Sequence, residues 1–235
     1  MQYGFYLKKF WFLYLCAAAL CFVAAMATSE AVTTIAENTP IARDHVIVID
    51  AGHGGEDGGA ISISGALESQ INLQIALRLN DLCHLLGYKT KMIRTTDVSV
   101  HTTGNTIAEK KISDLRNRVK MVNETTDAIL ISIHQNIFPA AKYKGAQVFY
   151  ADNASSKALA QSMQTAFVHS INPNSNRKCK PAEGVYLMQH VACPGVLVEC
   201  GFLSNPEEEV LLRSAQYQQK ICCVIVSALS SYLGT

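Results

Sequence analysis

The sequence lacks several features that mark common functional classes. No two of its eight cysteines stand in C-x-x-C spacing, so a zinc site built from four cysteines is unsupported. The glycine-rich stretch at residues 46–55 contains neither G-x-G-x-x-G nor G-x-x-x-x-G-K-[ST], which argues against a nucleotide-binding loop. There is no internal repeat, which argues against a repeat architecture.

The chain also lacks an excess of either charge. Charged residues make up 17% of its 235 residues and the net charge is +1. Without the first 27 residues, which carry two lysines and no acidic residue, the net charge becomes −1. We therefore expect no nucleic-acid partner. With 49% hydrophobic residues, the chain has enough apolar surface to fold.

The N-terminal segment differs from the rest of the chain. Lys8 and Lys9 precede an uncharged run from Phe10 to Ala27, which is 18 residues long. This layout is typical of a secretory signal peptide, and the length also reaches the lower limit of a membrane span. Both interpretations of residues 1–27 place the remainder outside the cytoplasm, exported or anchored. A polar linker at residues 28–44 then leads to one domain at residues 45–235.

The six cysteines beyond this segment are expected to be free thiols. Several lie within apolar runs, where cysteine behaves as a small hydrophobic residue. Disulfides are the alternative, because exported proteins form them readily. The residues concerned are Cys83, Cys179, Cys193, Cys200, Cys222 and Cys223.

Strand-like and helix-like segments alternate along the domain. Strands are predicted at residues 46–49, 88–95, 128–134, 145–150 and 195–200, and helices at residues 69–87, 113–123 and 155–170 and around residues 221–232. Residues 99–111 and 172–183 are predicted to be polar loops. This alternation predicts a single three-layer α/β domain, with a twisted, mostly parallel sheet flanked by helices.

Polar residues follow three of the buried strands. Asp50 and His53 follow the first, His134 ends another, and Glu199 lies at the end of the third. Glu68 closes the glycine-rich loop where the first long helix begins. Ligands of open α/β sheets bind at the carboxyl ends of the strands, so we expect these side chains to meet there.

Two histidines and one glutamate form a known catalytic zinc set that leaves one coordination position open. A further carboxylate that is not a ligand can then transfer protons. The alternative is that each residue is structural, as single polar residues at strand ends often are. The remaining histidines, His45, His84, His101, His169 and His190, are interpreted as structural or solvent-exposed, and N-x-[ST] matches at Asn123 and Asn153 as chance.

Six stretches resemble the zinc-dependent N-acetylmuramoyl-L-alanine amidases that cut bacterial peptidoglycan. They are VIDAGHGGEDGGA, ALESQINLQIALRL, RTTD, RNRVKMVN, ISIHQN and PGVLVECGFLSNPEE, in the family's order between residue 46 and about residue 232. The resemblance implies that His53, Glu68 and His134 bind one zinc ion and that Glu199 is the catalytic carboxylate. It also implies a single α/β domain and a peptidoglycan substrate.

The short chain and the stretch GAQVFY are most similar to the germination-specific branch of that family. The resemblance then implies removal of the stem peptide from muramic acid, so that muramic δ-lactam can form in spore cortex. Ala51, Gln135 and Cys200 depart from the residues usual in the family, and Gln135 is expected to affect substrate fit. The sequence does not show whether a partner protein activates the enzyme.

Two functions other than amide hydrolysis are compatible with parts of the sequence. A zinc exopeptidase would need extra bridging acids, for which Asp50, Glu56 and Asp57 are candidates, but no third histidine accompanies them. A non-catalytic, membrane-tethered wall-binding module would have no reason to keep two histidines and two glutamates at these positions.

The stretch NRKCK carries three basic residues in an otherwise polar loop. Arg177, Lys178 and Lys180 are either solvated or in contact with carboxylates of the substrate's stem peptide, since arginine and lysine pair well with carboxylates.

Overall fold

The computed structural model describes residues 44–235. The predicted signal peptide or membrane anchor at residues 1–27 and all but the last residue of the predicted linker lie outside the described residues. Between residues 44 and 235, every helix is too short or too polar to span a bilayer.

A six-stranded mixed sheet forms the centre of the domain, with the strand order β2-β1-β3-β6-β4-β5. All neighbouring strands are parallel except β4 and β6, which are antiparallel. The strands are β1 (Val46–Ala51), β2 (Lys89–Met92), β3 (Ala128–Asn136), β4 (Gln147–Tyr150), β5 (Lys180–Pro181) and β6 (Gly195–Phe202). The predicted α/β class and mostly parallel sheet are confirmed.

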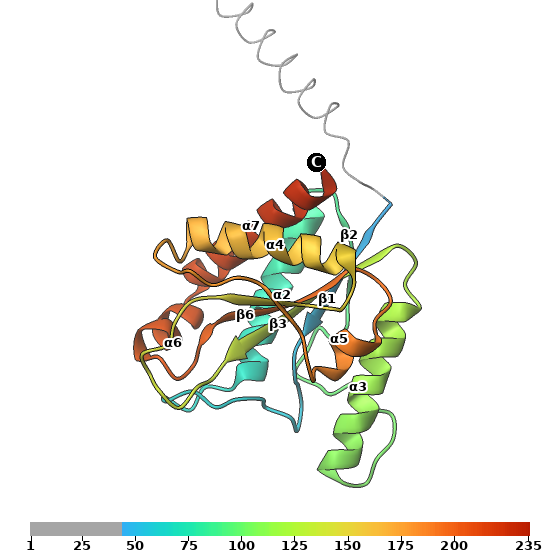
Figure 1. Cartoon of the computed structure of the whole chain (residues 1–235). Coiled ribbons are helices and arrows are strands. Elements are labelled where there is room, and N and C mark those ends of the chain that lie inside the picture. Colours follow the sequence, from blue (N-terminus) through green and yellow to red (C-terminus); the bar gives the residue numbers. More distant parts are fainter. Residues whose placement is uncertain (1–43) are drawn as a thin grey trace, which may run out of the picture. The chain divides into compact units, whose positions relative to one another are not determined.

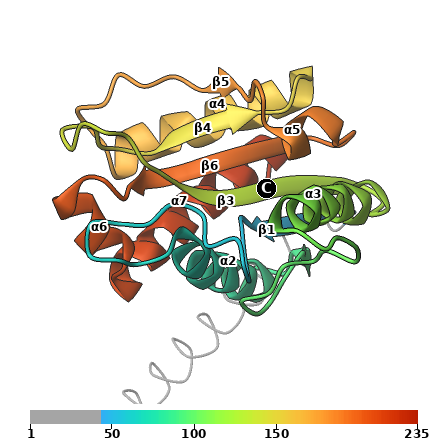
Figure 2. The ribbon, with the colours of Figure 1, turned by 90° about the horizontal axis from the view of Figure 1, so that it is seen from below.

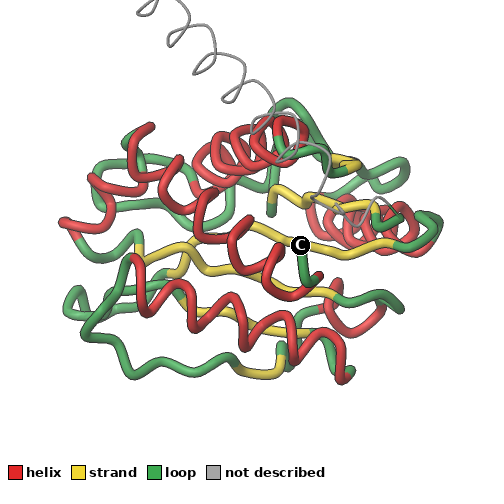
Figure 3. The backbone as a smooth tube through the Cα atoms, turned by 90° about the horizontal axis from the view of Figure 1, so that it is seen from above, coloured by secondary structure: helices red, strands yellow, loops and turns green. Residues whose placement is uncertain are grey.

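Helices cover both faces of this sheet (Figure 1). Their bounds are α2 (Glu68–Leu85), α3 (Ile107–Asn123), α4 (Ala154–Ser170), α5 (Tyr186–His190), α6 (Pro206–Leu212) and α7 (Ala215–Leu233). Helices α2, α4 and α7 share a buried cluster with one face of the strands, while α3 and α5 pack on the other (Figures 2 and 3).

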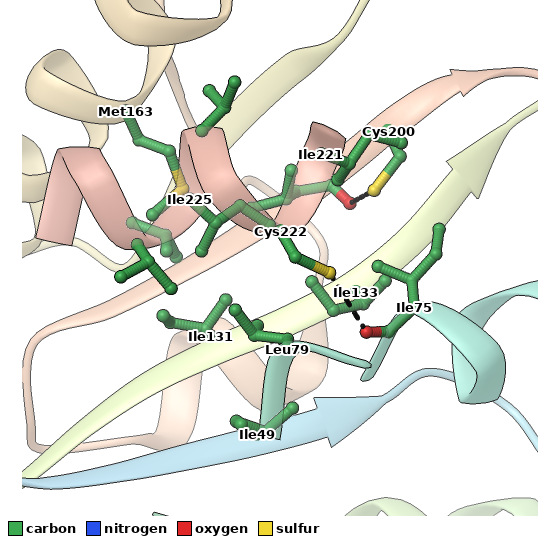
Figure 4. Close-up of a cluster of buried hydrophobic side chains, with 14 of the residues drawn as sticks. Ile49, Ile75, Leu79, Ile131, Ile133, Met163, Cys200, Ile221, Cys222 and Ile225 are labelled. Atoms are coloured by element: carbon green, nitrogen blue, oxygen red, sulfur yellow. Dashed lines mark hydrogen bonds between the residues drawn. The ribbon is translucent and has the colours of Figure 1, made fainter. Parts of the chain in front are cut away.

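The larger core lies between the sheet and helices α2, α4 and α7. Ile49, Ile131 and Ile133 point from the strands toward Ile75 and Leu79 of α2, and all five are fully buried (Figure 4). Alternate residues of a strand face opposite sides, so Val48 and Leu130 belong to the second cluster under α3 and α5. Continuous apolar runs in β1 and β3 are therefore explained by a sheet covered on both faces.

The sequence-based prediction placed the start of α3 too late. The helix begins at Ile107 and not near residue 113, so residues 107–111 are helical where a loop was expected. Thr106 accepts a hydrogen bond from the Glu109 backbone N–H, and the Glu109 side chain accepts from the Thr106 backbone N–H. This capping box satisfies donors at the helix start, and it offsets the polar composition that suggested a loop.

Three short elements were not predicted. Helices α5 and α6 lie in chain segments for which no helix or strand was predicted, and α6 has Asn205 as its N-cap and Pro206 in its first turn. Strand β5 lies within the predicted loop at residues 172–183. Two to seven residues are too few to show a hydrophobic period, which is why the pattern missed them.

All six cysteines of residues 44–235 are free, as expected. Cys83, Cys200 and Cys222 are buried, but Cys223 is exposed and Cys179 and Cys193 are partly exposed. Burial raises the pKa of Cys83 and of Cys222 to about 12, so these thiols stay protonated. Figure 4 shows Cys200 and Cys222 among the apolar side chains of the core, which is a structural role.

Candidate metal centre

His53 stands just beyond β1 in an uncommon backbone conformation. Its φ is 62°, in the left-handed region that few residues other than glycine adopt. The backbone turns here because Gly52 N–H donates to Ile133 O and Gly54 pairs with Asp57 in a short bridge. The turn lifts the imidazole out of the strand and directs it to the carboxyl edge of the sheet.

A buried ion pair between Arg118 and Asp50 stabilises this turn. Arg118 of α3 donates to Asp50 and Asp114, and also to the backbone carbonyls of Ala51 and His53. Asp50 also accepts from Ser132 of β3. Both members of the pair are almost fully buried, and the Arg118 guanidinium holds the pKa of Asp50 below its usual range although burial opposes this. Asp50 is therefore a structural residue.

We expect Arg118→Met to lower the free energy of unfolding by about 3–5 kcal/mol, because it leaves the Asp50 carboxylate buried without its cation. Chemical denaturation measures the change. Arg116→Met, on an exposed position of the same helix, is the control and should stay within about 0.5 kcal/mol of the parent. Replacing Asp50 with asparagine as well should recover part of the loss. A loss below about 1 kcal/mol for Arg118→Met would contradict this assignment.

Glu68 and His134 meet His53 at the same edge. Glu68 is the first residue of α2, and its Oε1 lies 2.9 Å from Nδ1 of His134. Its Oε2 lies 3.3 Å from Nε2 of His53 and accepts a hydrogen bond from the Ala60 N–H. The two imidazole rings are 5.1 Å apart and meet edge to face. The structure thus brings together the three side chains that the family resemblance implied as metal ligands.

The glycines of the loop leave room for these side chains. A Cβ at Gly52 would lie 2.2 Å from Nε2 of His134, and one at Gly59 would lie 2.7 Å from Oε2 of Glu68. Gly59 also has a φ of 69°, which favours glycine. Both positions exclude any larger residue unless the site itself moves.

Charge at the site favours binding of a cation. Burial opposes ionisation of Glu68, but hydrogen bonds from His134 and His53 hold its pKa below the ordinary value. Burial also opposes protonation of His53, yet hydrogen bonds with Asp57 and Glu68 raise its pKa to about 9. Asp57 and Glu68 thus both contact the imidazole of His53, and this concentration of negative charge favours a cation.

His53, Glu68 and His134 can together hold a metal ion. Each offers one ligand atom, and these atoms all lie within 4.8 Å of one another. Over residues 44–235 this is the one group of histidine, cysteine and acidic side chains close enough to do so. Two imidazole nitrogens and one carboxylate oxygen match the ligands that zinc takes in catalytic sites.

The candidate bridging acids do not complete a second set. Asp50 is occupied by Arg118, and Glu56 pairs with Lys110 at 2.8 Å on the surface. Asp57 accepts from Nδ1 of His53 at 3.0 Å and pairs with Lys111. Asp57 is thus placed to orient the ring of His53, as acids next to metal-binding histidines commonly do.

Glu199 lies on β6 beside the three clustered residues. It pairs with His134 of β3 in the parallel register, which sets the two side chains next to each other on the two central strands. Burial raises the pKa of Glu199 to about 7, although the two histidines act in the opposite direction. Its Oε2 is buried and has no hydrogen-bond partner in the described part of the chain. Leaving a buried acceptor unpaired costs free energy, and this makes Glu199 a candidate functional residue.

The supporting roles of two residues, Asn72 and Gln135, were not predicted from the sequence. Asn72 donates to Oε1 of Glu68 and to Gly52 O, and it stands four residues after Glu68, on the same face of α2. That spacing was the available signal. Gln135, which was expected to affect substrate fit, is buried. It donates its side-chain amide to Asn72 and its backbone N–H to Glu68, and so supports the cluster.

The three basic residues of the 172–183 segment lie in different surroundings. Arg177 donates to Gln147 and to Lys144 O, and its guanidinium lies 5.1 Å from the ring centroid of Phe202. Lys178 lines a cavity between this segment and α4. Lys180 lines a different groove, to which Glu199 also belongs.

Several proteins that are similar to this chain in sequence and fold are named N-acetylmuramoyl-L-alanine amidases. A family model described as N-acetylmuramoyl-L-alanine amidase matches residues 47–231. The germination-specific N-acetylmuramoyl-L-alanine amidase of Bacillus subtilis (strain 168) is 38% identical over 189 residues, which cover 80% of this chain and 79% of the relative.

Two solved structures share the fold over most of the chain. The CwlD amidase from Clostridioides difficile, in complex with the GerS lipoprotein, superposes with a TM-score of 0.78 and 36% identity, covering 81% of this chain and 98% of that one. An N-acetylmuramoyl-L-alanine amidase from Clostridium difficile 630 gives a TM-score of 0.70 and 29% identity, covering 82% and 98%.

Proposed function

Because this chain belongs to the N-acetylmuramoyl-L-alanine amidase family, we propose that it cleaves the amide bond between N-acetylmuramic acid and L-alanine in peptidoglycan with one zinc ion. The observation that carries the proposal is the meeting of His53, Glu68 and His134 beside the unpartnered carboxylate of Glu199.

The residues present fit a zinc ion. His53, Glu68 and His134 would hold it, since their donor atoms converge and their chemistry matches the ion. When bound, zinc supplies a Lewis acid that polarises a carbonyl group and makes water a nucleophile near neutral pH. Asp57 orients His53, and Asn72 and Gln135 hold Glu68, through hydrogen bonds.

Glu199 is proposed to move the protons. Hydrolysis requires that a water molecule lose a proton and that the leaving L-alanine nitrogen gain one. A single carboxylate performs both transfers in turn if its pKa lies near the working pH. Burial raises the pKa of Glu199 to about 7, and its free Oε2 leaves an acceptor for the water proton.

We further propose that the enzyme acts outside the cytoplasm, exported or anchored through its N-terminal segment, on spore cortex. The germination-specific relative and the shared short domain support this role in muramic δ-lactam formation. The CwlD structure contains the GerS lipoprotein, so a protein partner is proposed for this chain too. Cortex from cells that lack the protein should contain no muramic δ-lactam.

Digestion of peptidoglycan by the full chain, followed by mass spectrometry and metal analysis, tests the function. An amidase releases whole stem peptides, contains one zinc ion per chain and stops when a chelator removes it. A zinc exopeptidase releases single amino acids and holds two metal ions. A wall-binding module releases nothing, and either of the last two results would refute the proposal.

Zinc affinity is expected to rise as the pH increases from about 6.5 to 9. The pKa of His53 in the metal-free protein is raised from 6.5 to about 9, and the imidazole must lose its proton to bind a metal. The same shift stabilises the metal-free fold fully below pH 6.5, and this stabilisation is lost as the pH passes 9. Competition with a chelator at several pH values measures the affinity.

Asp57→Asn is the matched variant for this pH dependence. It removes a hydrogen bond that raises the pKa of His53, so the rise in zinc affinity should move to lower pH. A zinc affinity that stays constant between pH 7 and 9 in the parent would contradict the prediction.

A further inference from the structure

A groove of about 500 Å³ extends from Glu199 across the sheet face that carries α5. Its floor is apolar, formed by Leu197 of β6 and Phe149 of β4, and Val185 lines one side. Two charged residues besides Glu199 line it, Lys180 and Glu183. Because the groove includes the proposed proton-transfer residue, a molecule bound in it lies next to the reacting atoms.

The strand register aligns Lys180 with the floor of this groove. Strands β6, β4 and β5 lie side by side (Figure 2). Leu197 pairs with Phe149, and Phe149 pairs with Lys180, so the three residues form one row across these strands. Glu199 stands two positions further along β6 and on the same side as Leu197. From ordinary strand spacings, the backbones of Lys180 and Glu199 are about 12 Å apart.

Of the three basic residues of its segment, Lys180 is the one that lines this groove. Its ammonium group has no acidic partner in the described part of the chain. No carboxylate between residues 44 and 235 lies within 4.0 Å of its ammonium group, and Glu183 makes no ion pair with it. Arg177 is occupied by Gln147 and Lys144, and Lys178 lines the cavity on the α4 side. An exposed ammonium group at the end of an apolar groove suits an anionic group on an otherwise apolar chain.

We infer that Lys180 determines specificity by binding a carboxylate of the stem peptide, while Phe149 and Leu197 pack against the peptide between that carboxylate and the scissile bond. This inference rests on the proposed amidase function. The leaving peptide begins with L-alanine, and its acidic residues come after this alanine. A carboxylate therefore lies several ångströms beyond the scissile amide bond, next to which Glu199 is proposed to act. A lysine with its long stem can reach back along the groove to meet it.

The inference is tested with solubilised peptidoglycan strands, used directly or after chemical conversion of their carboxylates to carboxamides. The full chain, supplied with zinc, is assayed for newly freed L-alanine amino groups at low ionic strength. The parent protein should show a KM about tenfold lower for the carboxylate form, because the contact is made equally in the ground and transition states. Its kcat should be the same for both forms.

Lys180→Met should abolish the preference between the two forms and leave kcat unchanged, while Lys180→Arg should retain the preference. Lys178→Met is the matched control, since it removes the same charge two residues away and should keep the tenfold difference. A preference that persists in Lys180→Met, or that Lys178→Met removes equally, overturns the role of Lys180. If the parent cleaves both forms equally well, only this inference fails; if it cleaves neither, the proposed function fails.

Discussion

His134→Ala is expected to remove zinc from the protein and to abolish amide hydrolysis. His134 supplies one of three converging donor atoms, and a site that keeps only one imidazole and one carboxylate no longer offers the tripod that a catalytic zinc requires. Its ring also packs directly on Gly52, so alanine leaves a gap where the ligand stood. His53→Ala should have the same effect. Metal analysis of the purified variants, with circular dichroism to check folding, measures the result.

His169→Ala is the control for these variants. His169 is exposed on α4 and lines the cavity on the opposite side of the 172–183 segment from the groove of Glu199. It should therefore keep one zinc ion per chain and full activity. A folded His134→Ala protein that still holds one zinc ion per chain would show that the ligand assignment is wrong.

Much of the fold could be predicted because strong patterns encode it. Residues 46–49 and 128–131 are apolar runs typical of strands in a sheet covered on both faces, and both lie in inner strands. The order of the strands could not be predicted. Strand β4 lies antiparallel to β6 because of packing between segments that are distant in the sequence. The residues 145–150 carry no pattern that predicts this direction.

The candidate site residues stood out because each is a polar residue near the carboxyl end of an expected strand or at the start of a helix, and their roles came from the family resemblance. His53, Glu68, His134 and Glu199 follow that rule, and the structure clusters the first three beside the fourth, although β6 continues three residues beyond Glu199. Asp50 follows the same rule and is structural, because its partner Arg118 is 68 residues away in the chain. The sequence pattern could not distinguish a carboxylate that pairs with an arginine of the same chain from a carboxylate that is free to bind a ligand.

The same limit applies to the basic segment. Arg177, Lys178 and Lys180 are equivalent as a charge pattern, but the short strand β5 places the last of them in line with Phe149. Strand pairing of two residues is decided by tertiary contacts and carries no signal of its own. Only the structure therefore separates a residue of the groove from its neighbours.

Glu199→Gln is expected to keep zinc and peptidoglycan binding while kcat falls by about 10²–10⁴, the usual contribution of general acid–base catalysis. Glutamine preserves the size of the side chain but cannot take or give a proton. The loss should appear in kcat and not in KM, since the proton moves only in the transition state. Glu183→Gln is the control, because it removes a carboxylate from the same groove and should leave kcat intact. Single-turnover and steady-state assays measure both values. If Glu199 were only a polar residue of β6, glutamine would satisfy it equally well, and a folded variant with kcat within a few-fold of the parent would exclude its role in proton transfer.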